Sequence, residues 1–356
     1  MSKFPETDWD VAFYNTDANG VEFSVKPTSN IPLIRLFQSH ETLNAAQVKE
    51  LKTLLDRKAS VKEEDAWGRT ALMYAVEANG VDVVQMLLDA KSSPNEFDYK
   101  QFSVLTFAVR AKNFDVATFL LKKKAPIEWM DGDRRTPLVH AIRAGGADFV
   151  KYLIKHKADV DADCYEIMTP VAHAVREDNA EILRILLEAQ ANVNSVDIRG
   201  DSPLMSAARN ANVPIMKILL EARADLNVPG QDTTLMCAAS SGGATPEVVR
   251  ELIRARVDVN AVNDMNWTAL MFAAEAGHME CIRALITAKA DVEARNDKSM
   301  TALQLAAKNK HLDAVQLIYD LSKTSVNVAP VTNATDSADT DGAANANNED
   351  RPAKRR

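Results

Sequence analysis

The chain has 356 residues, 46% hydrophobic and only 6% aromatic, which is enough for two compact domains or one elongated array. A formal net charge of −8 disfavours general attraction to nucleic acid or anionic lipid. There is no run of ~18 apolar residues and no apolar signal segment at the start, so we expect no membrane insertion.

Residues 1–30 form an N-terminal arm that differs in pattern from everything after it. Val11 and Phe13 precede the pair Asn19-Gly20, and Val21 and Phe23 follow it. Alternating apolar residues around an Asn-Gly turn predict a β-hairpin. A disordered arm is the alternative interpretation.

A short phrase then repeats along the chain at a regular interval. It opens with Thr or Ser, continues with a small residue or Pro and then Leu or Val, and reaches Ala soon after. Thr and Ser favour helix N-caps, and Pro suits the first helical position, so each phrase predicts a helix start. The phrases open at Thr70, Ser103, Thr136, Thr169, Ser202, Thr233, Thr268 and Thr301.

A second apolar stretch follows each opening, with leucine pairs such as Leu87-Leu88, and closes in a small polar segment such as residues 158–161. The Thr/Ser opening, the leucine pair and the small polar closing segment together resemble the ankyrin repeat. The resemblance covers about eight repeats from residue 65 to 321, with a degenerate one from residue 31. It implies an all-α solenoid over residues 31–321, built from about nine helix–turn–helix repeats with β-turn fingers and a concave binding face. Such repeats bury their apolar faces only against their neighbours.

The residues that end the second helices depart from the family pattern, which usually has Gly there. Basic side chains predominate at this position: Lys58, Lys91, Lys124, Lys157, Gln190, Arg223, Arg256 and Lys289. One interpretation is that each cation offsets a helix dipole. The other is a basic edge that meets an acidic protein surface or nucleic-acid phosphate, although acidic neighbours such as Asp159 would weaken it.

The fingers carry apolar residues where polar tips would be ordinary: Trp67, Phe97, Tyr99, Phe102, Trp129, Met130, Tyr165, Ile167, Met265, Trp267 and Met300. Trp and Tyr are enriched at binding hot spots, which favours a protein-binding surface. Packing between neighbouring fingers is the alternative.

Some side chains of the first helices are expected to face the groove: Tyr74, Phe107, His140, His173, Met205, Met271 and Gln304. His140 and His173 lie one repeat apart, at ~10 Å, which is too far for joint metal ligation. We expect both to be hydrogen-bonded and half-exposed.

No motif for catalysis, phosphate binding or zinc binding is present. Cys164, Cys237 and Cys281 are widely separated, which disfavours disulfides and indicates a reducing compartment such as the cytoplasm. The sequence therefore predicts a protein that is not an enzyme and uses no cofactor or metal.

Residues 322–356 are rich in Asn, Ala, Asp and Thr, which predicts a disordered tail. Its basic end, Arg351–Arg356, is either a nuclear address or a solvated terminus. The predicted function is that of an adaptor or scaffold, monomeric on its own, that binds a protein partner. A regulatory subunit of an enzyme is the first alternative, and polyanion binding through the basic edge is the weaker one.

Overall fold

Each repeat folds into two short helices. The computed structural model describes residues 31–37, 42–78, 80–164, 168–227, 232–241 and 245–326. Within these residues eighteen helices form nine pairs, which confirms the all-α solenoid. The hairpin expected in residues 1–30 and the tail from residue 327 onwards lie outside the described residues.

The first helix of each repeat is short, and the second is usually slightly longer. The first helices are α2 (Pro32–Phe37), α4 (Ala71–Ala78), α6 (Val104–Arg110), α8 (Pro137–Arg143), α10 (Pro170–Arg176), α12 (Pro203–Arg209), α14 (Thr234–Ser240), α16 (Ala269–Ala276) and α18 (Ala302–Lys308). The second helices are α3 (Ala45–Asp56), α5 (Val81–Asp89), α7 (Phe114–Lys122), α9 (Ala147–Lys155), α11 (Ala180–Glu188), α13 (Val213–Glu221), α15 (Pro246–Arg254), α17 (Met279–Thr287) and α19 (Leu312–Val326).

Polar caps fix where the helices begin. Thr136 precedes α8, and its hydroxyl accepts a hydrogen bond from the backbone N–H of Val139 at 3.4 Å. Pro137 occupies the first position of that helix, where its missing N–H costs nothing. Asn179 caps α11 in the same way, accepting from the N–H of Ile182 at 2.9 Å. The repeated Thr/Ser and Asn residues therefore set the helix boundaries.

The second helices end in a Schellman motif. After α9, the N–H of Lys157 donates to the carbonyl of Ile154 at 2.9 Å, and that of Ala158 donates to Leu153 at 3.0 Å. Lys157 has φ of 71°, in the left-handed region. All eight residues at this position, the seven basic ones and Gln190, have φ between 58° and 78°.

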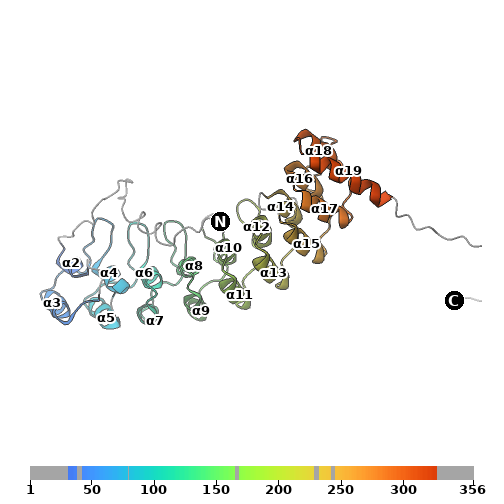
Figure 1. Ribbon diagram of the computed structural model, residues 1–356. Coiled ribbons are helices and arrows are strands. Elements are labelled where there is room, and N and C mark those ends of the chain that lie inside the picture. The colour runs from blue at the N-terminus through green and yellow to red at the C-terminus, as the bar shows by residue number, and fades with distance from the viewer. Residues whose placement is uncertain are drawn as a thin grey trace, which may run out of the picture.

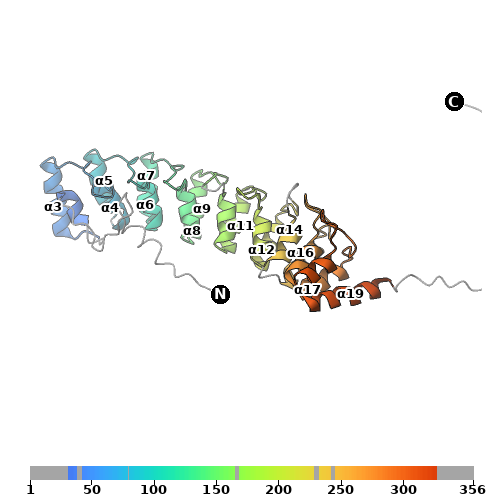
Figure 2. The same ribbon diagram turned by 90° about the horizontal axis from the view of Figure 1, so that it is seen from above.

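The repeats stack in one row that curves, with the first helices and fingers on the inner side (Figures 1 and 2). First helices contact first helices of adjacent repeats, and second helices form a parallel outer row. Leucines such as Leu138 and Leu153 are fully buried between them. The last helix, α19, continues to Val326, so the helical solenoid extends past the boundary expected at residue 321.

Candidate functional site

The fingers of six repeats are shaped by an Asp or Asn side chain at an equivalent position. The carboxylate oxygen Oδ1 of Asp98 accepts hydrogen bonds from the N–H groups of Lys100 and Phe102, at 3.0 and 2.8 Å. This bonding tightens the loop into a turn that points away from the helices. The equivalent acceptors are Asp65, Asp98, Asp131, Asp197, Asn263 and Asn296.

Neighbouring fingers are joined by backbone hydrogen bonds. The N–H of Tyr99 donates to the carbonyl of Trp67 at 3.0 Å, and that of Gly132 donates to Lys100 at 2.9 Å. Near the other end, the N–H of Asp297 donates to Met265 at 3.2 Å. These bonds link the fingers of three consecutive repeats near the start of the stack and of two repeats near its end.

Aromatic side chains pack between three adjacent fingers. The rings of Phe97 and Trp129 stack at 4.7 Å between centroids, and the Trp129 indole N–H donates to the carbonyl of Gln101 at 2.7 Å. The Tyr99 ring lies against Gly68, where an added Cβ would come within 2.3 Å of it. Packing between fingers therefore accounts for part of the aromatic content, as the alternative interpretation predicted.

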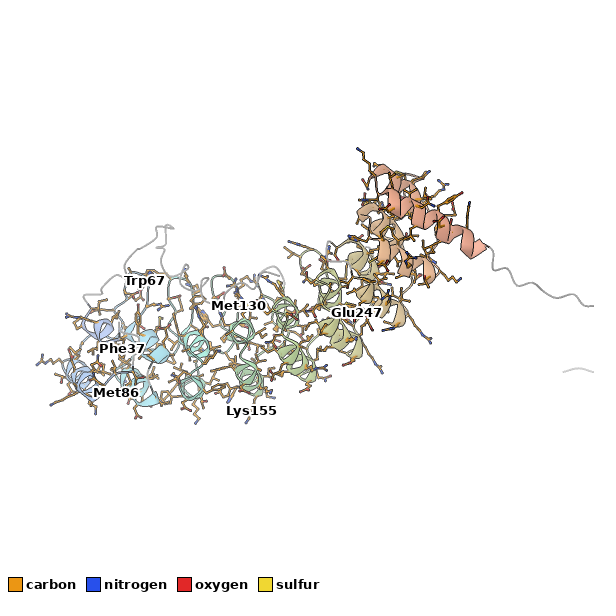
Figure 3. The ribbon with its side chains drawn as sticks, in the orientation of Figure 1. Phe37, Trp67, Met86, Met130, Lys155 and Glu247 are labelled. Atoms are coloured by element: carbon orange, nitrogen blue, oxygen red, sulfur yellow. The ribbon has the colours of Figure 1, made fainter. Side chains whose placement is uncertain are left out.

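The same fingers also expose large apolar side chains. Within the described residues, seven of the ten exposed large hydrophobic side chains belong to fingers: Phe97, Tyr99, Met130, Val196, Ile198, Val262 and Met265. Tyr99, Ile198 and Met265 are 61%, 59% and 56% exposed. Figure 3 shows Trp67 and Met130 on the finger side, opposite Met86 and Lys155.

Three of these exposed residues were missed by sequence reasoning, namely Val196, Ile198 and Val262. The repeat itself carried the signal that could have found them. Val196 and Val262 lie a whole number of repeats after Met130, and Ile198 occupies the position of Tyr99 in a later repeat.

The predicted partner-binding residues differ in accessibility. Trp67, Phe102, Trp129, Trp267 and Met300 are half-buried, whereas Tyr99, Met130 and Met265 are exposed. Tyr165 and Ile167 lie outside the described residues.

Most of the side chains that we expected to face the groove are buried, so that prediction was wrong for them. Tyr74, Phe107, Met205 and Met271 are buried, with 4% exposure or less, and among the predicted positions only Gln304 is exposed. The first helices have roughly two turns, and both neighbouring helices and the finger cover these positions. From α4 to α16, the exposed residues of the first helices all lie in the last turn.

The two histidines are buried rather than half-exposed as expected, and the expected hydrogen bond is present at His140. His140 is held by Asp131, whose Oδ2 lies 2.8 Å from Nε2. Burial lowers the pKa of His140, and the Asp131 hydrogen bond opposes that shift. His173 has no hydrogen-bond partner among the described residues. Cys164 replaces the aspartate at the position equivalent to Asp131 in this repeat, and burial raises the pKa of its thiol.

A row of arginines that sequence reasoning missed lies on the inner surface. Arg110, Arg143, Arg176 and Arg209 are the last residues of four consecutive first helices. Arg143, Arg176 and Arg209 are exposed and Arg110 is half-buried. They recur once per repeat, which is visible in the sequence and could have identified them.

The basic edge has a structural role in the fold. Its residues, Lys58, Lys91, Lys124, Lys157, Arg223, Arg256 and Lys289, are exposed and follow the second helices. A cation placed there lies next to the negative end of the helix dipole. This position agrees with helix capping.

Comparison with known proteins identifies the repeats. The family described as "Ankyrin repeats (3 copies)" matches residues 40–131, 105–197, 161–230, 190–262 and 235–329. The chain belongs to the ankyrin-repeat family. Ankyrin repeats generally serve as protein-interaction modules, and those of this chain span most of its length. A search of curated proteins found no match.

The described residues contain no helix long and apolar enough to cross a membrane. No group of three or more His, Cys, Asp or Glu side chains within them is placed to hold a metal ion. Cys164, Cys237 and Cys281 are free and buried.

Proposed function

We propose that this ankyrin-repeat chain is an adaptor or scaffold that binds a protein partner through its fingers and the inner ends of its first helices. The supporting observation is the concentration of exposed apolar side chains on the fingers, which run along one edge of the stack. Exposed apolar patches on a folded chain are typical of interaction sites. The edge is preorganised by hydrogen bonds between fingers, which lowers the entropy cost of binding.

The proposal locates the chain in the cytoplasm, because its three separated thiols suit a reducing compartment. The nucleus is the alternative location, with Arg351–Arg356 as the import signal. The partner is a protein in either case. A partner enzyme whose activity changes on addition of the chain would make it a regulatory subunit.

The test is affinity capture with two matched double variants. Ile198→Ser with Met265→Ser removes exposed apolar side chains from two fingers. Leu312→Ser with Tyr319→Ser removes two exposed apolar side chains from α19 and is the control. Both variants are checked by circular dichroism for an unchanged fold.

We expect the partner recovered with the unmodified chain to be lost with the finger variant and retained with the α19 variant. Recovery of the same partner with both variants would show that the finger edge is not the binding surface.

A further inference from the structure

Four consecutive repeats end their first helix with arginine, and the row stops sharply at both ends. The row consists of Arg110, Arg143, Arg176 and Arg209. One repeat before it the equivalent residue is Glu77, and beyond it come Ser240 and Glu275. Equivalent positions align in a solenoid, so the four guanidinium groups lie side by side along the inner surface.

Two of these arginines touch the finger of their own repeat. The Arg110 guanidinium lies 5.0 Å from the centre of the Phe102 ring. Nη1 of Arg176 lies 3.4 Å from the sulfur of Met168, which precedes it in the same repeat. The arginine row therefore occupies the angle between the fingers and the first helices. Contacts with the fingers restrict the side chains, which reduces the entropy lost when a ligand binds.

The other two arginines make ion pairs yet remain accessible. Nη2 of Arg209 lies 2.9 Å from Oδ1 of Asp201, and its side chain is 45% exposed. Nε of Arg143 lies 3.7 Å from Oε1 of Glu177, with 36% of its side chain exposed. Asp201 is only 14% exposed and also accepts from Arg209 through Oδ2 at 3.1 Å, so this pair holds the guanidinium group in place. Because both arginine side chains reach the solvent, a ligand carboxylate can approach their guanidinium groups.

His173 lies on the same helix as Arg176, α10. Burial, the largest cause, together with the charges of Arg176, Arg143 and Arg135 lowers the pKa of this imidazole to about 3. The nearby guanidinium groups therefore disfavour a further positive charge beside the row.

We infer that the arginine row binds an acidic, extended segment of the protein partner. The inference rests on the proposed function and specifies the chemistry of its partner. Helices that pack side by side are ~8–10 Å apart, so four arginines span roughly 24–30 Å. A segment in the extended polyproline II conformation has three residues per turn and advances about 3.1 Å per residue, so carboxylates at every third residue lie on one side and match the arginines over about ten residues.

The charge distribution favours a short segment with separate carboxylates over nucleic-acid phosphate. Guanidinium groups bind carboxylate and phosphate alike with two parallel hydrogen bonds. A long phosphate backbone would extend past the row to Glu77 at one end, and past Ser240 to Glu275 at the other, and the whole chain has a net charge of −8. Long polyanions are therefore repelled beyond the row, whereas a short acidic segment fits within it.

Fluorescence anisotropy with synthetic probes tests the inference on the full chain. The probes are a labelled peptide of about ten residues with Glu at every third position, a peptide of the same composition with its Glu residues contiguous, and a single-stranded oligonucleotide of similar length. Arg143→Glu with Arg176→Glu reverses the charge of the row. Lys124→Glu with Lys157→Glu makes the same change on the basic edge and serves as the matched control. Circular dichroism confirms that both variants are folded.

We expect the spaced peptide to bind most tightly, the row variant to weaken it by about tenfold or more, and the edge variant to change it by less than about twofold. Absence of peptide binding, equal weakening by both variants, or tighter binding of the oligonucleotide would each overturn the inference. In affinity capture, a partner lost with the Ile198→Ser and Met265→Ser variant but retained with the row variant would leave the adaptor function intact and reject the acidic segment.

Discussion

Replacement of Lys157 by Gly tests how the second helices end. Lys157 follows α9, has φ of 71°, and donates its N–H to the carbonyl of Ile154. Its side chain is exposed, so the substitution removes no buried contact. Glycine adopts this left-handed conformation freely, whereas any other residue meets steric resistance.

The expected magnitude follows from three opposing contributions. Relief of the left-handed conformation contributes roughly 1–2 kcal/mol to stability. The extra freedom of glycine in the unfolded chain costs about 0.5–1 kcal/mol. Loss of the cation at the end of the helix costs ~0.3–1 kcal/mol. The net change for Lys157→Gly is therefore close to zero, whereas Lys157→Ala loses the cation and gains no conformational relief.

Urea denaturation followed by circular dichroism measures both variants. We expect Lys157→Gly to be more stable than Lys157→Ala by about 1 kcal/mol. Lys91 lies at the equivalent position of an earlier, non-adjacent repeat. The stability changes caused by the same substitutions at Lys91 should therefore add to those at Lys157. A Gly variant less stable than the Ala variant by about 0.5–1 kcal/mol would refute the account, because only the freedom of glycine in the unfolded chain would then be seen and the left-handed backbone would carry no cost.

Three further predictions concern the inner repeats. Burial and nearby arginines lower the pKa of His173 to about 3, below its ordinary value. The neutral imidazole therefore costs the folded chain no stability above pH ~6.5, and the free energy of unfolding falls as the pH drops towards 3. The His173→Phe variant should show a smaller loss of stability over this range in urea titrations. Cys164→Asp introduces the carboxylate that Asp131 supplies in the preceding repeat, and NMR titration should show a higher His173 pKa together with a stability gain of ~1 kcal/mol. The Phe97–Trp129 stack should give a coupling of about 0.5–1.5 kcal/mol in a double-mutant cycle with alanine, and a coupling near zero would contradict the observed ring contact.

The fold was predictable because the same local sequence signals recur in many repeats. Thr136, Pro137 and the leucines mark one helix start and one apolar face, and their recurrence in every repeat removes the ambiguity of a single short segment. The positions where a basic residue has a left-handed backbone could also be located from the sequence, since the ankyrin family usually has Gly there. Their conformation depends on the Schellman hydrogen bonds, which the sequence does not display.

The site was harder to predict, because exposure depends on contacts between repeats. Tyr74 and Phe107 lie on short helices whose sides are covered by neighbours, so helical periodicity alone placed them on the wrong surface. Accessible positions are confined to the last turn, where Arg143 and its equivalents lie. Which aromatic residues pack between fingers, as Trp129 does, depends on the distance between loops that are far apart in sequence.

Hydrogen exchange on the chain with and without its captured partner tests the central claim most directly. The account predicts that binding slows exchange at the fingers, including Tyr99 and Ile198, and at the ends of the first helices near Arg143 and Arg176. Slower exchange confined to the second helices, α5 to α17, would contradict it, because the partner would then occupy the outer row of the solenoid.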